Sequence, residues 1–180
     1  VEIDLSLNDR LVDLVNEGFD LAIRIGTLSD SSLIARRIAG CRMVACAAPA
    51  YLADHGIPDH PSELEGHDCL AYAYGGSRDQ WRFSDRKAKI TVRFTPRIIA
   101  NNGDALTAAA ISGLGVIVQP AFIVQGALKD GRLREILSSF HAGQLGVHAV
   151  YPHSRLLSAR VRTFIDYLVI CYGDEDFRDN

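Results

Sequence analysis

Four hydroxyl side chains follow an apolar run near the start of the chain. Residues 21–25 predict a buried strand, and the loop after it (GTLSDSS, residues 26–32) carries Thr27 and three serines. A turn needs only one or two hydrogen-bonding side chains. The loop could be a solvated surface loop or the rim of a binding cleft. The number of hydroxyl groups favours the cleft, where they could recognise a small polar ligand.

Two more polar, glycine-containing loops follow predicted strands. In YGGS (residues 74–77), an aromatic ring beside glycines suits close approach of a flat ligand, although the segment could be only a turn. In NNGD (residues 101–104), the first N–H groups of a predicted helix favour an anion, and plain capping by an asparagine explains the pattern equally well. Ligands of parallel sheets bind beyond the carboxyl ends of the strands, so the three loops could converge on one ligand.

The cysteines show neither a CxxC pair nor the spacing of a metal finger. They stand at four scattered positions: Cys41, Cys46, Cys69 and Cys171. We expect buried, reduced thiols, as in a cytosolic protein. A redox-sensing pair of Cys41 with Cys46 is the less favoured alternative.

No residue set for catalysis, a metal or a cofactor is recognisable. The chain has no GxSxG motif, and His55, His60 and His67 lack the spacing of HExxH, which favours solvated loop histidines. Gly113 and Gly115 end a predicted helix and begin a strand, whereas a dinucleotide loop runs from strand to helix. We therefore predict a non-enzymatic domain with no catalytic residue, no metal and no cofactor.

The composition is that of a soluble globular protein. The 180 residues are 48% hydrophobic and 23% charged, with a formal net charge of −3. Acidic and basic residues are mixed, so we expect this chain alone not to bind nucleic acid. No charge-free apolar run reaches the roughly 18 residues of a membrane helix. The first residues lack the apolar core of a signal peptide and alternate like a strand over residues 1–6, so we expect a part of a longer protein.

Periodicity predicts strands that alternate with helices. Expected helices cover residues 9–17, 50–56, 105–112, 121–129 and 158–171. Expected strands cover residues 19–25, 33–39, 41–48, 68–74, 96–100, 115–120, 132–137 and 145–152, with a hairpin of 81–85 and 89–94. Such alternation predicts mostly parallel sheets that are covered by helices on both faces.

Five segments together resemble the effector-binding (substrate-binding) domain of LysR-type transcriptional regulators. They are EGFDLAIRIGTLSDSSLIARRIA (17–39), VACAAPAYLADHGIP (44–58), HPSELEGHDCLAY (60–72), NNGDALTAAAISGLGVIVQP (101–120) and VHAVYPHSRLLSARVRTFIDYL (147–168). They occur in the family's order and cover nearly the whole chain. The combination of DLAIRIG, APAYL and the closing YPxSR…FIDYL is specific, whereas each motif alone is weak.

The resemblance implies an α/β, two-lobed fold like the type 2 periplasmic binding proteins. Each lobe would be a mostly parallel sheet flanked by helices, with two crossover strands as the hinge. Lobe I would comprise residues 1–48 and 147–180, and lobe II residues 49–146. The family's N-terminal winged helix-turn-helix is not in this chain, and neither are the usual first strand and helix of the domain.

The resemblance also implies an effector site in the cleft between the lobes. By position in the family's motifs, the residues that would face the effector are Gly26, Thr27, Tyr74, Gly75, Asn102, Gly103, Gln119 and Pro120. These residues come from the ends of strands and the start of a helix in both lobes.

The function implied is that of the regulatory domain of a cytoplasmic bacterial transcription factor. It would bind a small-molecule effector, form a homodimer or higher homo-oligomer, contact DNA only through the missing N-terminal domain, and contact no membrane. Three alternatives stay open: a periplasmic solute-binding protein of the same fold, an enzyme on an α/β sheet, and a domain that only mediates dimerisation.

Overall fold

The computed structural model describes residues 2–10, 12–28, 33–74, 78–153 and 158–173. The elements are, in chain order, β1 (Ala22–Gly26), β2 (Leu33–Ala47), α1 (Pro49–His55), the 3₁₀ helix η1 (Pro61–Gly66), β3 (Cys69–Tyr72), β4 (Gln80–Ser84), β5 (Lys89–Arg93), β6 (Pro96–Ala100), α2 (Gly103–Ile111), β7 (Val116–Pro120), α3 (Ala121–Lys129), β8 (Arg134–Glu135), β9 (Gln144–Pro152) and α4 (Ala159–Tyr172). The expected alternation of strands and helices is therefore present from β1 onward.

The main sheet is mixed, and the prediction of mostly parallel sheets is wrong. Its strand order is β1-β9-β2-β7-β3-β6, with β8 also on β2, while β4 and β5 form a separate hairpin. Only the pairs of β3 with β6 and β7 are parallel. β9 runs between β1 and β2 and is antiparallel to both. β1 and β2 therefore run in the same direction and are separated by β9.

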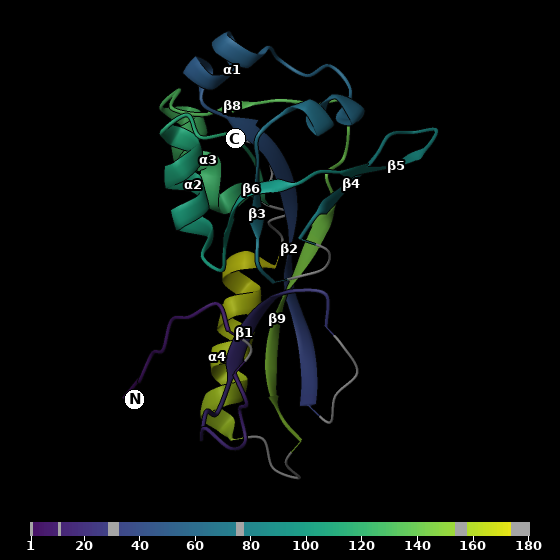
Figure 1. The fold of residues 1–180 in the computed structure, drawn as a ribbon. Helices are drawn as coiled ribbons and strands as arrows, with labels where there is room; N and C mark the ends of the chain where they lie inside the picture. The colour runs from purple at the N-terminus through teal and green to yellow at the C-terminus, as the bar shows by residue number, and fades with distance from the viewer. Residues whose placement is uncertain (1, 11, 29–32, 75–77, 154–157, 174–180) are drawn as a thin grey trace.

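The strand β2 runs through the whole molecule. The two strands expected at residues 33–39 and 41–48 are one strand, because Gly40 between them pairs with Gly146 of β9 and does not end it. Figure 1 shows β2 and β9 side by side through a narrow waist. We call β1, α4 and the start of β2 the first half. The second half contains the end of β2, the strands β3, β6 and β7, and the helices α1 to α3.

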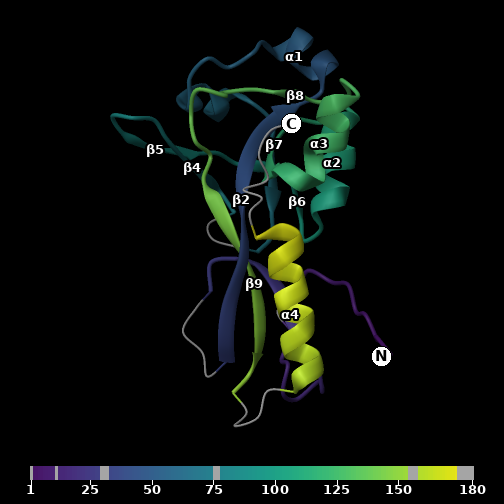
Figure 2. The same cartoon turned by 180° about the vertical axis from the view of Figure 1, so that it is seen from behind.

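Two apolar cores cover opposite faces of the sheet in the second half. Val44 and Cys46 of β2 belong to the core under α2 and α3, whereas Ala45 and Ala47 belong to the core under α1, η1 and the hairpin. Alternate residues of a strand point to opposite faces, so β2 contributes to both cores. A third core packs Ile165 of α4 on β2 and β9 in the first half. Figure 2 shows α4 beside these two strands from behind. Helices thus cover both faces of the sheet.

Local signals set the ends of several elements as predicted. Pro49 stands at the first turn of α1, and Gly56 follows it with a φ of 86°. The Asn102 side chain caps α2. In the β4–β5 hairpin, the Asp85 carboxylate accepts hydrogen bonds from the backbone N–H groups of Lys87 and Ala88, which lower its pKa. Short-range hydrogen bonding and backbone geometry suffice for these elements.

The strand expected at residues 1–6 is not formed by the described residues 2–6. Ile3 and Leu5, which were to face a core, are exposed. The segment pairs with none of the described strands. An alternating segment becomes a stable strand only when a neighbouring strand pairs with it, and none of the described strands pairs with residues 2–6.

The helix expected at residues 9–17 is also wrong, since its described residues form only a turn at 14–17. The Asp13 carboxylate accepts a hydrogen bond from the backbone N–H of Asn16 at 3.1 Å, which stabilises the turn over a continued helix. Leu14 is buried, so one apolar side chain anchors this segment.

Ile117→Ala in β7 should lower the free energy of unfolding by about 3 kcal/mol, because it opens a cavity in a packed core. Ile117 is 0% exposed, whereas Ile99 of the edge strand β6 is 48% exposed. The matched control Ile99→Ala should therefore lower it by no more than about 1 kcal/mol. Urea denaturation measures both values, and equal losses would contradict the core assignment.

Candidate functional site

The carboxyl ends of β1 and β7 lie on opposite sides of the β9–β2 pair, near the waist. Gly26, the last residue of β1, pairs with Gly146, which pairs with Gly40 of β2. Pro120, the last residue of β7, pairs with Met43 of β2. Gly40 and Met43 are three residues apart, which is roughly 10 Å at ~3.3 Å per residue. One strand end from each half thus lies at the waist.

At the start of α2, Asn102 has a capping role. Its Oδ1 atom accepts a hydrogen bond from the backbone N–H of Ala105 at 2.8 Å. Its Nδ2 atom donates to the Asp9 carboxylate at 3.3 Å. The cap uses the amide oxygen of Asn102. Its Nδ2 group is therefore the part that a ligand can reach, since its present partner, Asp9, is exposed.

The site residues of α2 and β7 lie against one another. Gly103 is buried in the first turn of α2, and a Cβ atom there would lie 2.9 Å from Ile123 and 3.1 Å from Oε1 of Gln119. Gln119 is only 3% exposed. Pro120, also buried, caps the start of α3. The structure therefore brings together four of the predicted residues, and the ends of the Ile123 and Gln119 side chains lie close against the backbone at position 103.

Tyr74 follows β3 and is exposed, with its ring edge-on to Tyr72 at a centroid distance of 6.0 Å. The backbone N–H of Ala73 donates to the carbonyl of Ala100 at 2.8 Å, which holds the ends of β3 and β6 together. Burial raises the pKa of Tyr72, and the Asp9 carboxylate raises it further. Asp9 thus lies near both Tyr72 and Asn102, a contact that no sequence motif signalled.

Thr27 is exposed beyond the end of β1, after Gly26 with a φ of 141°. Within the described ranges, no hydrogen bond joins Thr27 to Asn102 or Gln119. Gly75 and the serines among residues 29–32 lie outside the described residues. The structure thus groups the residues of the second half and leaves Thr27 on the other side of the waist.

Cys41 of β2 lies in the same region, between the pairing positions of the two strand ends. It is buried, and burial raises the pKa of its thiol, an effect partly offset by the N–H groups of Ala121 and Phe122 at the start of α3. Cys46 is five residues away on the same extended strand, roughly 16 Å at ~3.3 Å per residue. A disulfide needs Cα atoms within about 7 Å, so these two thiols cannot pair in this fold.

The prediction of buried thiols is confirmed for three of the four cysteines and is wrong for Cys171. Cys41, Cys46 and Cys69 are free and buried, and Cys171 is free and exposed. Burial raises the pKa of Cys46 and of Cys69 to about 12, which keeps both protonated and unreactive at neutral pH.

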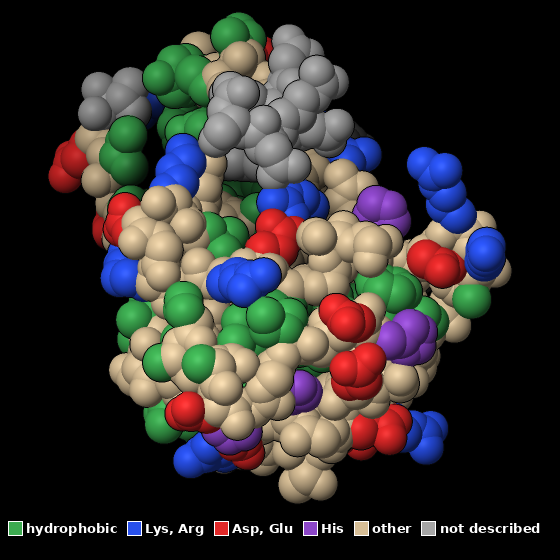
Figure 3. Space-filling view, turned by 90° about the horizontal axis from the view of Figure 1, so that it is seen from above, with side chains coloured by type: hydrophobic (Ala, Val, Ile, Leu, Met, Phe, Trp, Pro, Cys, Tyr) green, Lys and Arg blue, Asp and Glu red, His purple; other side chains and the backbone are tan. Residues whose placement is uncertain are grey.

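Three kinds of site are not found in the part of the chain that the structure describes. No three His, Cys, Asp or Glu side chains are grouped as metal ligands. None of its helices combines the length and the apolar character needed to cross a membrane. On the face shown in Figure 3, basic and acidic side chains are interspersed, and this face has no continuous basic patch of the kind that binds nucleic acid.

The fold is that of the regulatory domains of bacterial transcription regulators. The full-length virulence activator AphB of Vibrio cholerae superposes with a TM-score of 0.81 at 26% identity, over 96% of this chain and 58% of that one. The regulatory domain of CrgA, a LysR-type transcriptional regulator from Neisseria meningitidis, superposes with a TM-score of 0.77 at 32% identity, over 88% of this chain and 78% of that one.

The chain belongs to the LysR substrate binding domain family, whose model matches residues 1–169. The regulator PtxR of Pseudomonas aeruginosa is 34% identical over 99% of the chain, and an HTH-type transcriptional regulator of Haemophilus influenzae is 37% identical over 89%. The chain spans 57% and 56% of the lengths of these two proteins. These relatives are transcriptional regulators and not enzymes, so the enzyme alternative is set aside.

Replacing the cap of α2 should lower stability. Asn102→Ala should reduce the free energy of unfolding by about 1 kcal/mol, because the N–H of Ala105 loses its acceptor. Asn102→Ser keeps an acceptor oxygen and should lower the free energy of unfolding by less than half of this amount. Thermal denaturation of the two variants compares them, and an equal loss would show that the hydrogen bond to Ala105 does not stabilise the helix.

Proposed function

We propose that the chain is the effector-binding regulatory domain of a cytoplasmic bacterial LysR-type transcription factor. It binds a small metabolite between its two halves and acts on DNA only through a winged helix-turn-helix that precedes it in the full-length regulator. The ends of β1 and β7, which flank the β9–β2 pair at the waist, carry the proposal, together with the start of α2 beside β7. The membership of the family supports it.

The proposed lobes are residues 1–48 with 147–180, and residues 49–146. β2 and β9 are the connections that cross the waist (Figure 1), where Gly40 pairs with Gly146, and we propose these two strands as the hinge. A ligand in contact with both halves favours one angle between them. Thermodynamic linkage then requires that the ligand bind the conformation with this angle more tightly than it binds other conformations. The difference in affinity between the conformations is the regulatory signal.

The proposed ligand is a small polar or aromatic acid. The first turn of α2 presents backbone N–H groups, which attract a carboxylate. The Gln119 amide is buried beside them, and Tyr74 offers an aromatic surface at the end of β3. On the opposite side, the Thr27 hydroxyl is exposed and can donate or accept a hydrogen bond. The whole set contacts one ligand only when the halves close on it.

We also propose that the domain forms a homodimer through α4. Phe164, Tyr167 and Ile170 are 41%, 59% and 81% exposed. They are spaced by three residues and share one side of the helix, away from buried Ile165. An exposed apolar surface of this kind indicates a protein partner. A second copy of the chain is the partner that the family's regulators commonly use.

The effector site is tested with Thr27→Val and Asn102→Leu. A screen of small organic acids by thermal shift identifies a stabilising metabolite, and calorimetry then measures its affinity. Each variant should weaken binding at least about tenfold, since each removes a hydrogen bond to the ligand worth about 1.4 kcal/mol. Thr91→Val on exposed β5 is the matched control and should bind normally. Wild-type affinity in both site variants would refute the assignment.

A further inference from the structure

Three glycines stand side by side at the waist, one on each of the strands β1, β9 and β2. Gly26 pairs with Gly146, and Gly146 pairs with Gly40. Directly paired residues of antiparallel strands share one face of the sheet. Alternation along β2 places Gly40 on the face of Val44, which packs under α2 and α3. This glycine row therefore leaves bare backbone on the face that carries the start of α2.

The ring of His148 covers part of the glycine row. A Cβ atom on Gly146 would lie 2.1 Å from Cε1 and 2.8 Å from Nε2 of His148, so the ring lies directly over the Gly146 backbone. Among the described residues, neither ring nitrogen has a hydrogen-bond partner, and Nδ1 is fully enclosed. A buried acceptor without a partner is tolerated better than a buried donor, which favours the proton on Nε2. The Nε2–H group is then a donor for a ligand.

Two arginines flank His148 on the same face of the sheet. Arg24 of β1 and Arg37 of β2 are its direct pairing partners, and the Cβ atoms of paired residues lie about 5 Å apart. Arg24 donates to the carbonyl of Val12 at 2.7 Å, and Arg37 is exposed. Within the described part of the chain, neither guanidinium has a carboxylate partner. Two such cations beside an imidazole N–H attract an anion.

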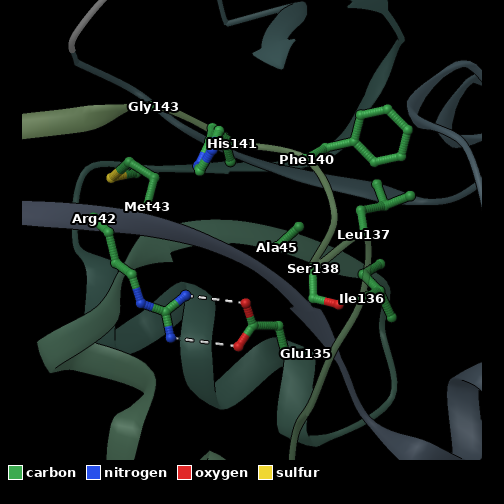
Figure 4. A pocket seen from close by; sticks show the side chains of 11 residues that line it. Arg42, Met43, Ala45, Glu135, Ile136, Leu137, Ser138, Phe140, His141 and Gly143 are labelled. Carbon is green, nitrogen blue, oxygen red and sulfur yellow. Dashed lines mark hydrogen bonds and ion pairs between the residues drawn. The ribbon is translucent and has the colours of Figure 1, made fainter. Parts of the chain in front are cut away.

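The other arginines of these strands are already neutralised. Arg42, beyond the glycine row on the same face of β2, binds both carboxylate oxygens of Glu135 at 3.0 and 3.4 Å, as the dashed lines in Figure 4 show. Arg36 faces the opposite side of the sheet and pairs with Asp166 of α4. In β1 and β2, which the structure describes throughout, the two arginines beside His148 are therefore those whose charge no carboxylate balances.

We propose that the effector is a small dicarboxylic acid, and that His148 and its two flanking arginines bind its second carboxylate. This inference rests on the proposed effector site, which holds the first carboxylate at the start of α2. There, the Gln119 side chain is only 3% exposed, and no described residue forms a hydrogen bond with its amide. The first carboxylate replaces Asp9 as the partner of Asn102.

The spacing of the two carboxylate sites sets the length of the ligand. The His148 ring lies level with Gly40 of β2, whereas Gln119 pairs with Val44. Gly40 and Val44 are four residues apart, which is roughly 13 Å at ~3.3 Å per residue. A hydrogen bond of about 2.9 Å at each end leaves roughly 7 Å between the two carboxylates. Extended adipate spans about this distance, and succinate is too short.

Adipate and hexanoate are the probes, because hexanoate has a methyl group in place of the second carboxylate. Calorimetry on the intact protein should show that adipate binds at least about tenfold more tightly than hexanoate or succinate. His148→Phe keeps a ring over the glycine row and removes the N–H donor, and Arg37→Gln removes an exposed cation. Each variant should lower the affinity for adipate toward that for hexanoate and leave the affinity for hexanoate unchanged.

Arg36→Gln is the matched control, since it removes a cation from the opposite face of the same strand, and it should bind adipate normally. No binding of adipate, equal affinities for adipate and hexanoate, or normal adipate binding by both His148→Phe and Arg37→Gln would overturn the inference. If Asn102→Leu then still weakens the binding of hexanoate, the proposed effector site stands without a second carboxylate. If Asn102→Leu affects neither acid, the proposed effector site fails as well.

Discussion

Hydrogen bonding along both edges of β2 is the constraint on which the rest of the structure depends. Over residues 33–42 its partner is β9, and from Met43 onward β7 pairs with its other edge. Its side chains alternate between the two cores of the second half. The two halves are thus parts of one sheet, and any change in the angle between them must bend or twist β2 and β9.

This arrangement places ligand-accessible surfaces next to the strand that links the halves. The ends of β1 and β7 leave backbone and side-chain groups near the waist, on opposite sides of the β9–β2 pair. On the edge of β2 that pairs with β9 and β8, the pairing is interrupted between Gln144 and Glu135, and the bulged segment there borders a cavity. A ligand at the proposed effector site would act directly on the waist, which is the requirement for converting binding into a change of shape.

Short-range signals predicted most elements, including the start of α2 and the end of β7, whereas long-range pairing was not predictable. The cap at Asn102, the turn at Asp85 and the buried run of β7 depend on neighbours within a few residues, and these are as predicted. The insertion of β9 between β1 and β2 joins segments more than a hundred residues apart, and no local pattern encodes it. The positions of Asp9 and of the cavity also depend on contacts between distant segments, so no local pattern indicated them.

The most direct measurement is amide hydrogen exchange of the intact protein, with and without the metabolite found by thermal shift. The account predicts slower exchange in the presence of the ligand for residues 26–28, 101–106 and 119–123 together, because one ligand contacts both halves at the waist. Protection confined to one half, or protection only of residues 136–143, would contradict an effector site at the strand ends.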